Sequence, residues 1–466
     1  MASNTRKEGS APTRAHDGKL VREVTETAES GDPGRRAVLR GGLAMAGGAL
    51  LWPAIGRTAE AATPAATATS PAAAAAPAAA EPSAPPADPD WSQSLGPGVV
   101  DRPYGKPSQF VKDVIRRNVP WLTATTQSSV SFTPLQHQTG ILTANGLFFE
   151  RYHAGRASVD PAQHRLLIHG LVDRPLILSM EDIRRFPAVS RIHFIECPAN
   201  GGMEWRAAQL NSLQFTHGMV SCAQWTGVKL STLLAEVGIK SKARWVLAEG
   251  ADGAHMDRSL PLAKCLEDCL VVYGQNGEAL RPEQGFPLRL IVPGWQGNVN
   301  IKWLRRLELG DRPWFTREET AKYTELMPDG QARAFTWAIY AKSVITSPCP
   351  ELPPDKPGLY EVRGFAWSGN GRIRRVDVSW DGGVNWVEAR LEAPVLAKAL
   401  TRFTAEWRWD GKPALLQSRA VDETGYVQPT IAELRKIRGV NPIYNNNSIQ
   451  TWQVKADGSV FDVQLG

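Results

Sequence analysis

A segment near the start of the chain cannot form a folded core, and this limits where the folded part can begin. Residues 62–89 are nearly all Ala, Pro, Thr and Ser. This composition lacks the large apolar side chains that a core requires, and it favours an extended, solvated chain. We therefore expect residues 62–95 to be a disordered tether and the folded part to begin near residue 96.

The segment before the tether has the pattern of an export signal. Residues Gly34–Arg40 read Gly-Arg-Arg-Ala-Val-Leu-Arg, and a Gly/Ala-rich apolar stretch follows them up to Gly56. That stretch is too short and too weakly apolar for a stable membrane span, and Ala59–Ala61 offers a small-residue cleavage site. The paired arginines predict that residues 1–61 are a twin-arginine signal, which implies a periplasmic mature protein with no membrane span. An ordinary secretory signal is the alternative.

The charge balance and the cysteines narrow the functional classes. The chain has 53 Lys and Arg against 47 Asp and Glu, a small surplus for 466 residues, and no run of cations resembles a phosphate-binding stripe. Nucleic acid is therefore not an expected partner. Five cysteines are too few for a disulfide scaffold in an exported protein of this length. Because the chain has no Cys-x-x-Cys-His segment, we expect no c-type haem in it.

Hydrophobic patterning divides the rest of the chain into two parts and predicts an α+β protein. Between residues 96 and 328, strand-like runs such as Arg165–Gly170 alternate with helical runs such as Leu230–Gly238, which predicts a mixed α/β domain. From about residue 340, short runs alternate apolar and polar residues between Gly-rich turns, which predicts a β-sandwich domain over residues 329–460. The clearest of these runs are Tyr360–Trp367, Ile373–Trp380 and Arg402–Trp409.

Two cysteines lie four residues apart in a predicted helix. The run Leu260–Val272 contains Cys265 and Cys269. Helical residues at this spacing have Cβ atoms about 5–6 Å apart, beyond the ~3.8 Å typical of a disulfide. We therefore predict two buried thiols rather than a disulfide. The sequence assigns no role to either of them, or to Cys222 and Cys349.

A third position, Cys197, is the strongest candidate for chemistry. It ends a strand-like run, Arg191–Glu196, and opens onto a turn that contains Asn200, Gly201 and Gly202. Small turn residues leave the sulfur accessible from one side, as a metal ligand with an open coordination position requires. A soft thiolate suits a metal with other soft ligands. The alternative is a buried, inert thiol.

Four segments of the first domain carry distinctive patterns. The first segment ends in Phe-Glu-Arg-Tyr-His, the second has the pattern Cys-x-x-Asn, the third has Gly-Phe-Pro-x-Arg followed by Val-Pro-Gly and Ile-Lys-Trp, and the fourth contains Tyr323. In order, the segments are Thr143–His153, Cys197–Gly202, Gly285–Leu304 and Ala321–Pro328. These segments resemble the sulfite oxidase family of molybdopterin enzymes, and the second domain resembles that family's immunoglobulin-like dimerisation domain. The similarity covers roughly residues 96–455.

The resemblance implies a role for each matching residue. Cys197 would be the protein ligand of molybdenum, beside two dithiolene sulfurs of the pterin cofactor. Arg151 would place positive charge next to the substrate oxyanion, and Tyr323 would donate a hydrogen bond and relay a proton. The remaining positions would contact the pterin, and a phosphate group needs an Arg fork, an ammonium group and main-chain donors. These positions are His153, Asp252, Gln284, Arg289, Asn300, Ile301 and Lys302.

Longer phrases, including Glu249–Ser259 and Asn445–Trp452, resemble the sulfane dehydrogenase branch of this family. This implies oxidation of sulfane sulfur bound to a cysteine of a sulfur carrier protein, with electrons passing to a c-type cytochrome subunit. It also implies a homodimer through the C-terminal domain or a heterotetramer. Gly201 and Gly202 replace the arginines common in sulfite oxidases, which predicts a wider entrance with less positive charge.

Three alternatives remain open from the sequence. The nearest is a sulfite dehydrogenase that oxidises free sulfite and reduces cytochrome c. The second is a molybdenum reductase of sulfoxides, and the third is a non-enzymatic exported β-sandwich protein that binds a partner and has lost its cofactor.

Overall fold

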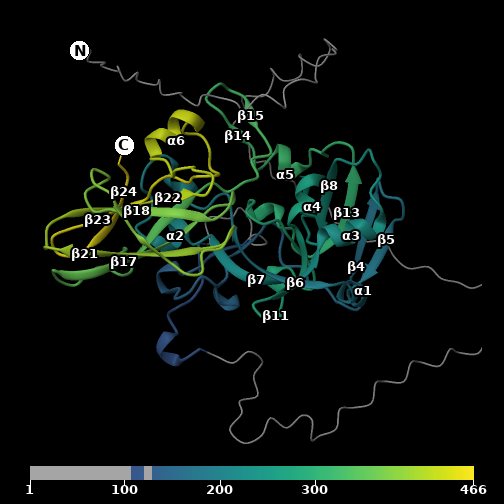
Figure 1. The fold of residues 1–466 in the computed structure, drawn as a ribbon, viewed down its shortest axis with the longest axis horizontal. Coiled ribbons are helices and arrows are strands. Elements are labelled where there is room, and N and C mark those ends of the chain that lie inside the picture. Colours follow the sequence, from purple (N-terminus) through teal and green to yellow (C-terminus); the bar gives the residue numbers. More distant parts are fainter. Residues whose placement is uncertain (1–106, 120–128, 466) are drawn as a thin grey trace, which may run out of the picture. The chain divides into compact units, whose positions relative to one another are not determined.

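A computed structural model describes residues 107–119 and 129–465 of the chain (Figure 1). The predicted signal segment, residues 1–61, and the predicted tether, residues 62–95, lie outside these residues. Strands dominate the described part and helices are short, which confirms the predicted α+β class. The strands form several separate sheets.

Two sheets of the N-terminal half carry segments that resemble the family. A three-stranded antiparallel sheet has the order β1-β2-β3, and Arg151 on β3 lies opposite Val130 on β2. A five-stranded sheet has the order β11-β10-β7-β6, with β12 paired to β10. Their bounds are β1 Arg117–Asn118, β2 Ser129–Phe132, β3 Glu150–Tyr152, β6 Ala188–Glu196, β7 Val220–Lys229, β10 Leu270–Gln275, β11 Glu278–Ala279 and β12 Arg289–Ile291.

A second five-stranded sheet has the order β5-β4-β13-β8-β9, and only β13 and β4 run parallel. Helix α3, Leu230–Val237, packs on its core because Leu230, Leu233, Leu234 and Val237 recur at helical spacing and are buried. Its end at Gly238, with φ 67°, matches the predicted stop. The strands are β4 Arg165–Gly170, β5 Leu176–Ser179, β8 Trp245–Gly250, β9 Asp257–Pro261 and β13 Leu304–Gly310; the other short helices are α1 Met180–Arg185, α2 Leu213–His217, α4 Leu262–Glu267 and α5 Arg317–Thr320.

The predicted helix over Leu260–Val272 is mostly wrong. Helix α4 ends at Glu267, and β10 begins at Leu270. The β-branched Val271 and Val272 pair in a sheet with β7 and β12, a position that such residues favour. The prediction of buried free thiols is confirmed for Cys265 and Cys269, and all five cysteines are buried and free.

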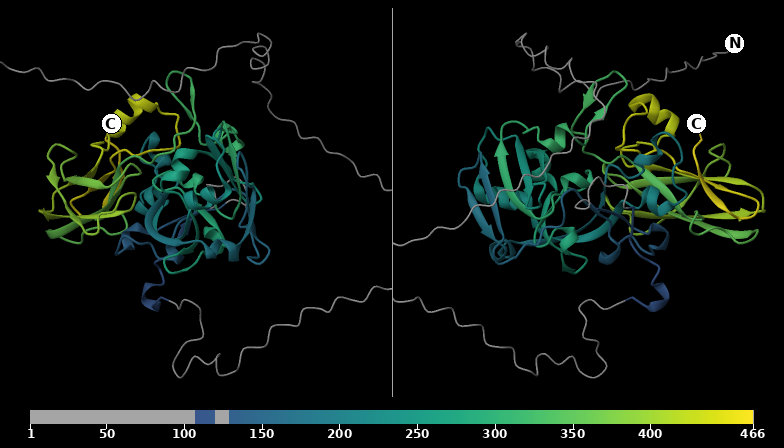
Figure 2. Two further views of the ribbon diagram at one scale, coloured as in Figure 1. Left: turned by 45° about the vertical axis from the view of Figure 1, so that its right-hand side comes forward. Right: turned by 180° about the vertical axis from the view of Figure 1, so that it is seen from behind.

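The C-terminal half is a sandwich of two antiparallel sheets, as predicted from the alternating runs (Figures 1 and 2). One sheet has the order β16-β17-β21-β20, and the other has the order β19-β18-β22-β23-β24. Val362 and Phe403 from the first sheet share a buried cluster with Val376 and Trp452 from the second. The bounds are β16 Lys342–Ser347, β17 Gly358–Trp367, β18 Ile373–Ser379, β19 Val387–Glu388, β20 Arg390–Glu392, β21 Thr401–Trp409, β22 Ala414–Asp422, β23 Thr451–Val454 and β24 Val460–Val463, with helix α6 Ile431–Arg438; the hairpin β14 Glu325–Leu326 and β15 Ala332–Arg333 precedes them.

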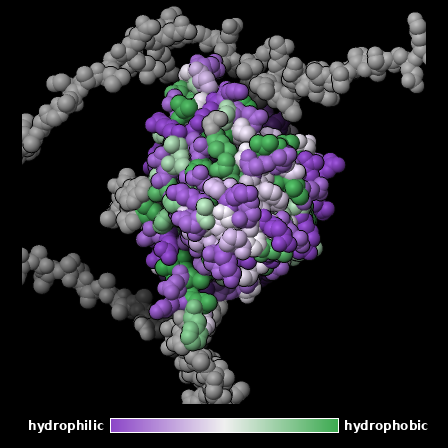
Figure 3. Space-filling view, turned by 90° about the vertical axis from the view of Figure 1, so that its left-hand side faces the viewer, coloured by the Kyte–Doolittle hydropathy of each residue, from purple (hydrophilic) through white to green (hydrophobic). Residues whose placement is uncertain are grey.

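The surface is mixed in character. The face in Figure 3 is mostly hydrophilic, with apolar side chains in small separate patches. Exposed apolar side chains of the described residues include Ile177, Val384 and Ile437. Within residues 107–119 and 129–465, no helix combines the length and the apolar character needed to cross a bilayer.

Candidate active site

One cavity of about 660 Å³ collects every residue that the resemblance assigned to the site. Strand β3, the end of β6, strand β12 and the segments that flank β13 supply its wall. The structure therefore places the predicted site residues together, while the role of each residue remains a prediction. The ten residues are Arg151, His153, Cys197, Asp252, Gln284, Arg289, Asn300, Ile301, Lys302 and Tyr323.

Cys197 follows the last residue of β6 and lies where this cavity meets a second one. Its N–H donates to Met219 O at 3.0 Å, and its carbonyl accepts from Asn200 N at 2.9 Å, so the backbone on both sides of the sulfur is held. Only 7% of the residue is exposed, and burial raises the pKa of the thiol. The thiol is therefore protonated at neutral pH, and a bound metal ion would deprotonate it.

Two cations of the cavity lack an ionic partner among the described residues. The Arg289 guanidinium is 3% exposed, and its hydrogen bonds go to neutral oxygens of Gln284 at 2.9 and 3.2 Å. The Lys302 ammonium group donates to the backbone oxygen of Glu283 at 2.8 Å. Arg289 Nε is buried and has no hydrogen-bond partner in the described part of the chain. Buried cations are normally paired, so this end of the cavity fits an anionic group such as a phosphate.

Burial also lowers the pKa of both cations, to about 9 for Arg289 and to about 7 for Lys302. Neighbouring Arg289 adds a smaller contribution to the shift of Lys302. Both shifts have the sign expected where desolvation of a positive charge outweighs the attraction of nearby carboxylates.

The Lys302 shift predicts a pH-dependent affinity for anions in the cofactor-free protein. Above about pH 7 Lys302 is neutral, so binding of an anion must bring a proton with it. The charge of sulfate does not change in this pH range. Its dissociation constant should therefore rise between about pH 7 and about pH 8.5, by up to about tenfold per pH unit. Isothermal titration calorimetry would measure this. Lys302→Met should bind sulfate weakly at every pH in the window, and a constant affinity in the unmodified chain would contradict the prediction.

Three predicted pterin contacts use their side chains within the protein. Asn300 Oδ1 accepts from Val292 N at 2.8 Å, and its Nδ2 donates to Gln296 O at 3.0 Å. Asp252 Oδ1 accepts from Met256 N at 2.9 Å. Gln284 Oε1 accepts a hydrogen bond from Arg289 Nη1 at 2.9 Å, and Gln284 Nε2 donates to Phe149 O at 3.0 Å. All three residues line the cavity, and Gln284 orients the Arg289 guanidinium.

Arg151, His153 and Tyr323 form a polar chain beside Cys197. His153 Nε2 lies 2.7 Å from Tyr323 Oη, and His153 Nδ1 lies 3.3 Å from Arg151 Nη2. Burial, with a smaller effect of Arg151, lowers the pKa of His153 to about 3, while burial raises the pKa of Tyr323. The imidazole is therefore neutral and the phenol protonated at neutral pH. Tyr323 has φ 53°, a backbone conformation that is rare for aromatic residues and often marks a functional site.

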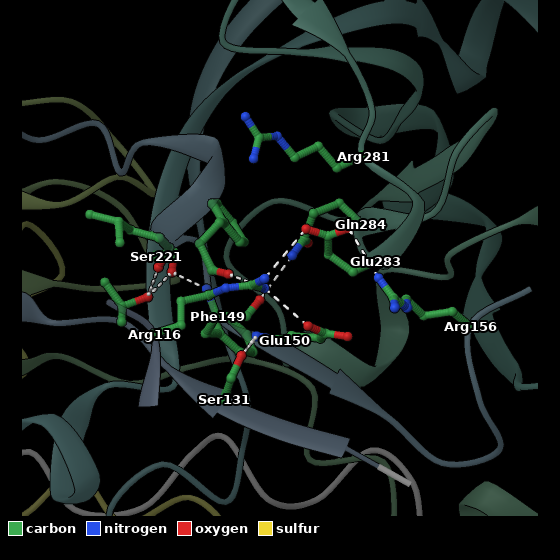
Figure 4. Close-up of polar contacts among 12 residues, drawn as sticks. Arg116, Ser131, Phe149, Glu150, Arg156, Ser221, Arg281, Glu283 and Gln284 are labelled. Carbon is green, nitrogen blue, oxygen red and sulfur yellow. Dashed lines mark hydrogen bonds and ion pairs between the residues drawn. The ribbon is translucent and has the colours of Figure 1, made fainter. Parts of the chain in front are cut away.

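An ion-pair network involves two carboxylates that are adjacent in sequence to residues lining the cavity (Figure 4). Arg116, from the described N-terminal segment, lies 3.0 Å from Glu150 and 3.5 Å from Glu283. Arg156 lies 3.7 Å from Glu283. Glu150 and Glu283 directly precede Arg151 and Gln284 in the sequence. Because both carboxylates are paired, their charge opposes an anion in the cavity less than unpaired carboxylates would.

The second cavity, about 1080 Å³, adjoins Cys197 and forms an entrance with mainly apolar walls. Gly201 and Gly202 line it, and a mouth wider than that of sulfite oxidases stays a prediction. Packing requires these glycines as well, because Gly201 has φ 77° and a Cβ on Gly202 would lie 2.3 Å from Ile443 O. Its other lining residues include Ala199, Met203, Leu210, Phe215, Met219, Ile443 and Tyr444, together with the ionisable Arg151, His153, Cys197, Glu204, Lys322 and Tyr323.

Sequence reasoning missed several residues of the site. Trp303 lines the first cavity with φ 51°, and its indole N–H is buried with no partner in the described part of the chain. Its place in the Ile-Lys-Trp phrase was a usable signal. Ile443 and Tyr444 come from the C-terminal half, and the Tyr444 ring lies 5.2 Å from that of Tyr323. No local sequence pattern predicts such a long-range contact.

Comparisons with known proteins agree with this geometry. Residues 153–317 match the family described as oxidoreductase molybdopterin binding domain, and residues 333–452 match the Mo-co oxidoreductase dimerisation domain. Mitochondrial sulfite oxidase of Mus musculus is 31% identical over 327 residues, which cover 65% of this chain and 60% of that enzyme. Sulfite oxidase of Gallus gallus is 32% identical over 325 residues, covering 64% of this chain and 71% of that enzyme.

A solved structure is more similar. The crystal structure of the sulfane dehydrogenase SoxCD from Paracoccus pantotrophus contains a chain that is 52% identical, with a TM-score of 0.78. The match covers 81% of this chain and 97% of that one. The similarity includes both halves of the described fold.

Proposed function

Because the chain belongs to the sulfite oxidase family of molybdenum oxidoreductases, we propose that it oxidises sulfane sulfur bound to a cysteine of a carrier protein. The observation that carries this proposal is the entrance beside Cys197. Its walls are mainly apolar, and Arg151 and Lys322 are its only cations among the described residues. A small dianion such as sulfite needs several cations around it, whereas a protein-bound sulfane needs room and apolar contact.

The residues of the first cavity fit a molybdopterin cofactor. Cys197 Sγ would bind the metal, and Arg289 and Lys302 would bind the phosphate. The buried Arg289 and the half-buried Lys302 have no ionic partner within residues 107–119 and 129–465. When bound, this cofactor supplies oxygen-atom transfer and accepts two electrons.

The polar chain beside Cys197 would serve the reaction itself. The Arg151 guanidinium would stabilise negative charge that develops on the oxidised sulfur group. Tyr323 Oη would hold a proton next to the reacting atoms, since its pKa is raised and the neutral His153 lies within hydrogen-bond distance. The Tyr444 ring packs against Tyr323 on the entrance side and would limit how far the phenol can turn.

We further propose that the electrons leave one at a time to a c-type cytochrome subunit. The chain has no haem-attachment motif of its own, which supports a separate acceptor. The similarity of residues 333–452 to a dimerisation domain supports a homodimer or a heterotetramer. The twin-arginine pattern near the N-terminus supports export to the periplasm with the cofactor already inserted.

A substrate comparison tests the proposal. The purified holoenzyme should reduce its cytochrome subunit with a peptide whose cysteine carries a persulfide, at a kcat/KM at least about tenfold above that for free sulfite. Steady-state assays of both substrates at one ionic strength would measure this. More efficient turnover of free sulfite would favour the sulfite dehydrogenase alternative.

A further inference from the structure

A buried carboxylate directly precedes the proposed metal ligand. Glu196 is the last residue of β6 and is 3% exposed. Its Oε1 accepts from Asn200 Nδ2 at 2.8 Å and from Lys342 Nζ at 3.2 Å, and its Oε2 accepts from Trp367 Nε1 at 2.7 Å. Both oxygens are therefore occupied by donors.

Two of the three donors come from the C-terminal sandwich. Lys342 begins β16 and Trp367 ends β17, and both side chains are almost fully buried. The Lys342 ammonium group also donates to the backbone oxygen of Asn200 at 3.0 Å and lies 5.9 Å from the centre of the Trp367 ring. The sandwich thus contacts both the residue before Cys197 and the turn after it.

The same turn is held by further contacts. Asn200 Oδ1 accepts from Met219 N at 3.1 Å, and the Asn200 N–H donates to the carbonyl of Cys197. Asn446 Nδ2 donates to Gly201 O at 3.0 Å. The position of the sulfur is therefore set by β6, which precedes Cys197, and by the turn that follows it, which is hydrogen-bonded to residues of the C-terminal half.

Stability alone does not explain a buried ion pair here. Desolvation of an ammonium group and a carboxylate offsets most of their attraction, and apolar residues of similar volume often serve a core as well or better. A fully satisfied polar network does, however, define one geometry more sharply than apolar packing does. A metal ligand needs such definition, because partners outside the ligand shell orient it.

We propose that Lys342 and Trp367 are positioning residues for Cys197. Acting through Glu196 and Asn200, they fix the direction of the sulfur and couple the sandwich to the metal centre. This inference rests on the proposed function, in which Cys197 binds molybdenum. A network that only joins the two halves would affect folding without affecting the metal.

Two tryptophan variants separate these roles. Trp367 and Trp452 are both fully buried in the sandwich, and each donates one indole hydrogen bond, Trp452 to Ile345 O at 3.0 Å. Trp367→Phe and Trp452→Phe in the holoenzyme should lower the melting temperature by similar amounts. Only Trp367→Phe should shift the electron paramagnetic resonance signal of the reduced metal and lower kcat by about tenfold or more, at unchanged molybdenum content.

A charge-removal pair provides the second test. Glu196→Gln and Lys342→Met each leave one buried charge unpaired, so each should lower the melting temperature and the metal content. The double variant should recover most of the melting temperature, but its resonance signal should stay shifted because Asn200 O still lacks its donor. A double variant and a Trp367→Phe variant that both show the unmodified signal and kcat would overturn the inference.

The outcome remains separable from a failure of the proposed function. If Cys197→Ser keeps the unmodified resonance signal, the assignment of Cys197 as the ligand fails. If Cys197→Ser alters the signal while Trp367→Phe and the double variant do not, only the positioning role fails.

Discussion

Cys197→Ser is expected to abolish turnover while leaving the chain folded and the pterin bound. A serine hydroxyl is a poor substitute for a thiolate as a ligand of a soft-ligated metal. We expect kcat to fall by roughly three orders of magnitude or more, as for loss of other essential catalytic groups. The phosphate end of the cavity, with Arg289 and Lys302, is unchanged by the substitution. Activity, pterin content and melting temperature of the purified variant would be measured together.

Cys222 offers a matched control. It is fully buried on β7, pairs with Phe194 of β6, and belongs to a separate apolar core cluster. Cys222→Ser should therefore cost stability but keep turnover per bound molybdenum. Retained activity in Cys197→Ser, or an equal loss of activity in both variants, would contradict the assignment.

Arg289→Gln is expected to lose most of the cofactor. Truncating one partner of a buried, charge-assisted contact typically costs about 2–5 kcal/mol of binding energy. The extracted pterin, measured by fluorescence after oxidation, should fall accordingly. Cofactor-free Arg289→Gln should be at least as stable as the unmodified cofactor-free chain, because the substitution removes a buried cation that has no ionic partner among the described residues.

Arg289→Lys provides the control for charge. An ammonium group keeps the positive charge but not the two-pronged geometry of the guanidinium. This variant should retain an intermediate pterin content. Full cofactor content in Arg289→Gln would show that the phosphate lies elsewhere.

Much of the fold could be predicted because local patterns govern it. The sandwich strands alternate apolar and polar residues, and runs such as Ile373–Ser379 form where expected. The ten candidate site residues came from the resemblance to the sulfite oxidase family, and the structure places all of them around one cavity, while their roles stay predictions. Cys197 follows β6 and Arg289 begins β12, so the topology brings them to one cavity.

The rest depends on contacts that no local pattern encodes. Lys342 reaches Glu196 across 146 positions of the chain, and its burial is visible only after the two halves pack. The helix predicted over Leu260–Val272 does not extend to Val272, because the last residues of this run pair with β7 and β12 in a sheet. The sequence predicted that Gly202 serves a wide entrance. The structure adds a second reason for glycine at this position, because Ile443 O lies too close to leave room for a side chain.

The proposed function depends on a bond between Cys197 Sγ and molybdenum in the first cavity. X-ray absorption at the molybdenum edge, recorded on the holoenzyme and on Cys197→Ser at equal metal loading, tests it most directly. We expect the variant to have one sulfur neighbour fewer at the metal, replaced by an oxygen or nitrogen. An unchanged sulfur count, or a protein that contains no molybdenum when purified from cells that supply it, would contradict this assignment.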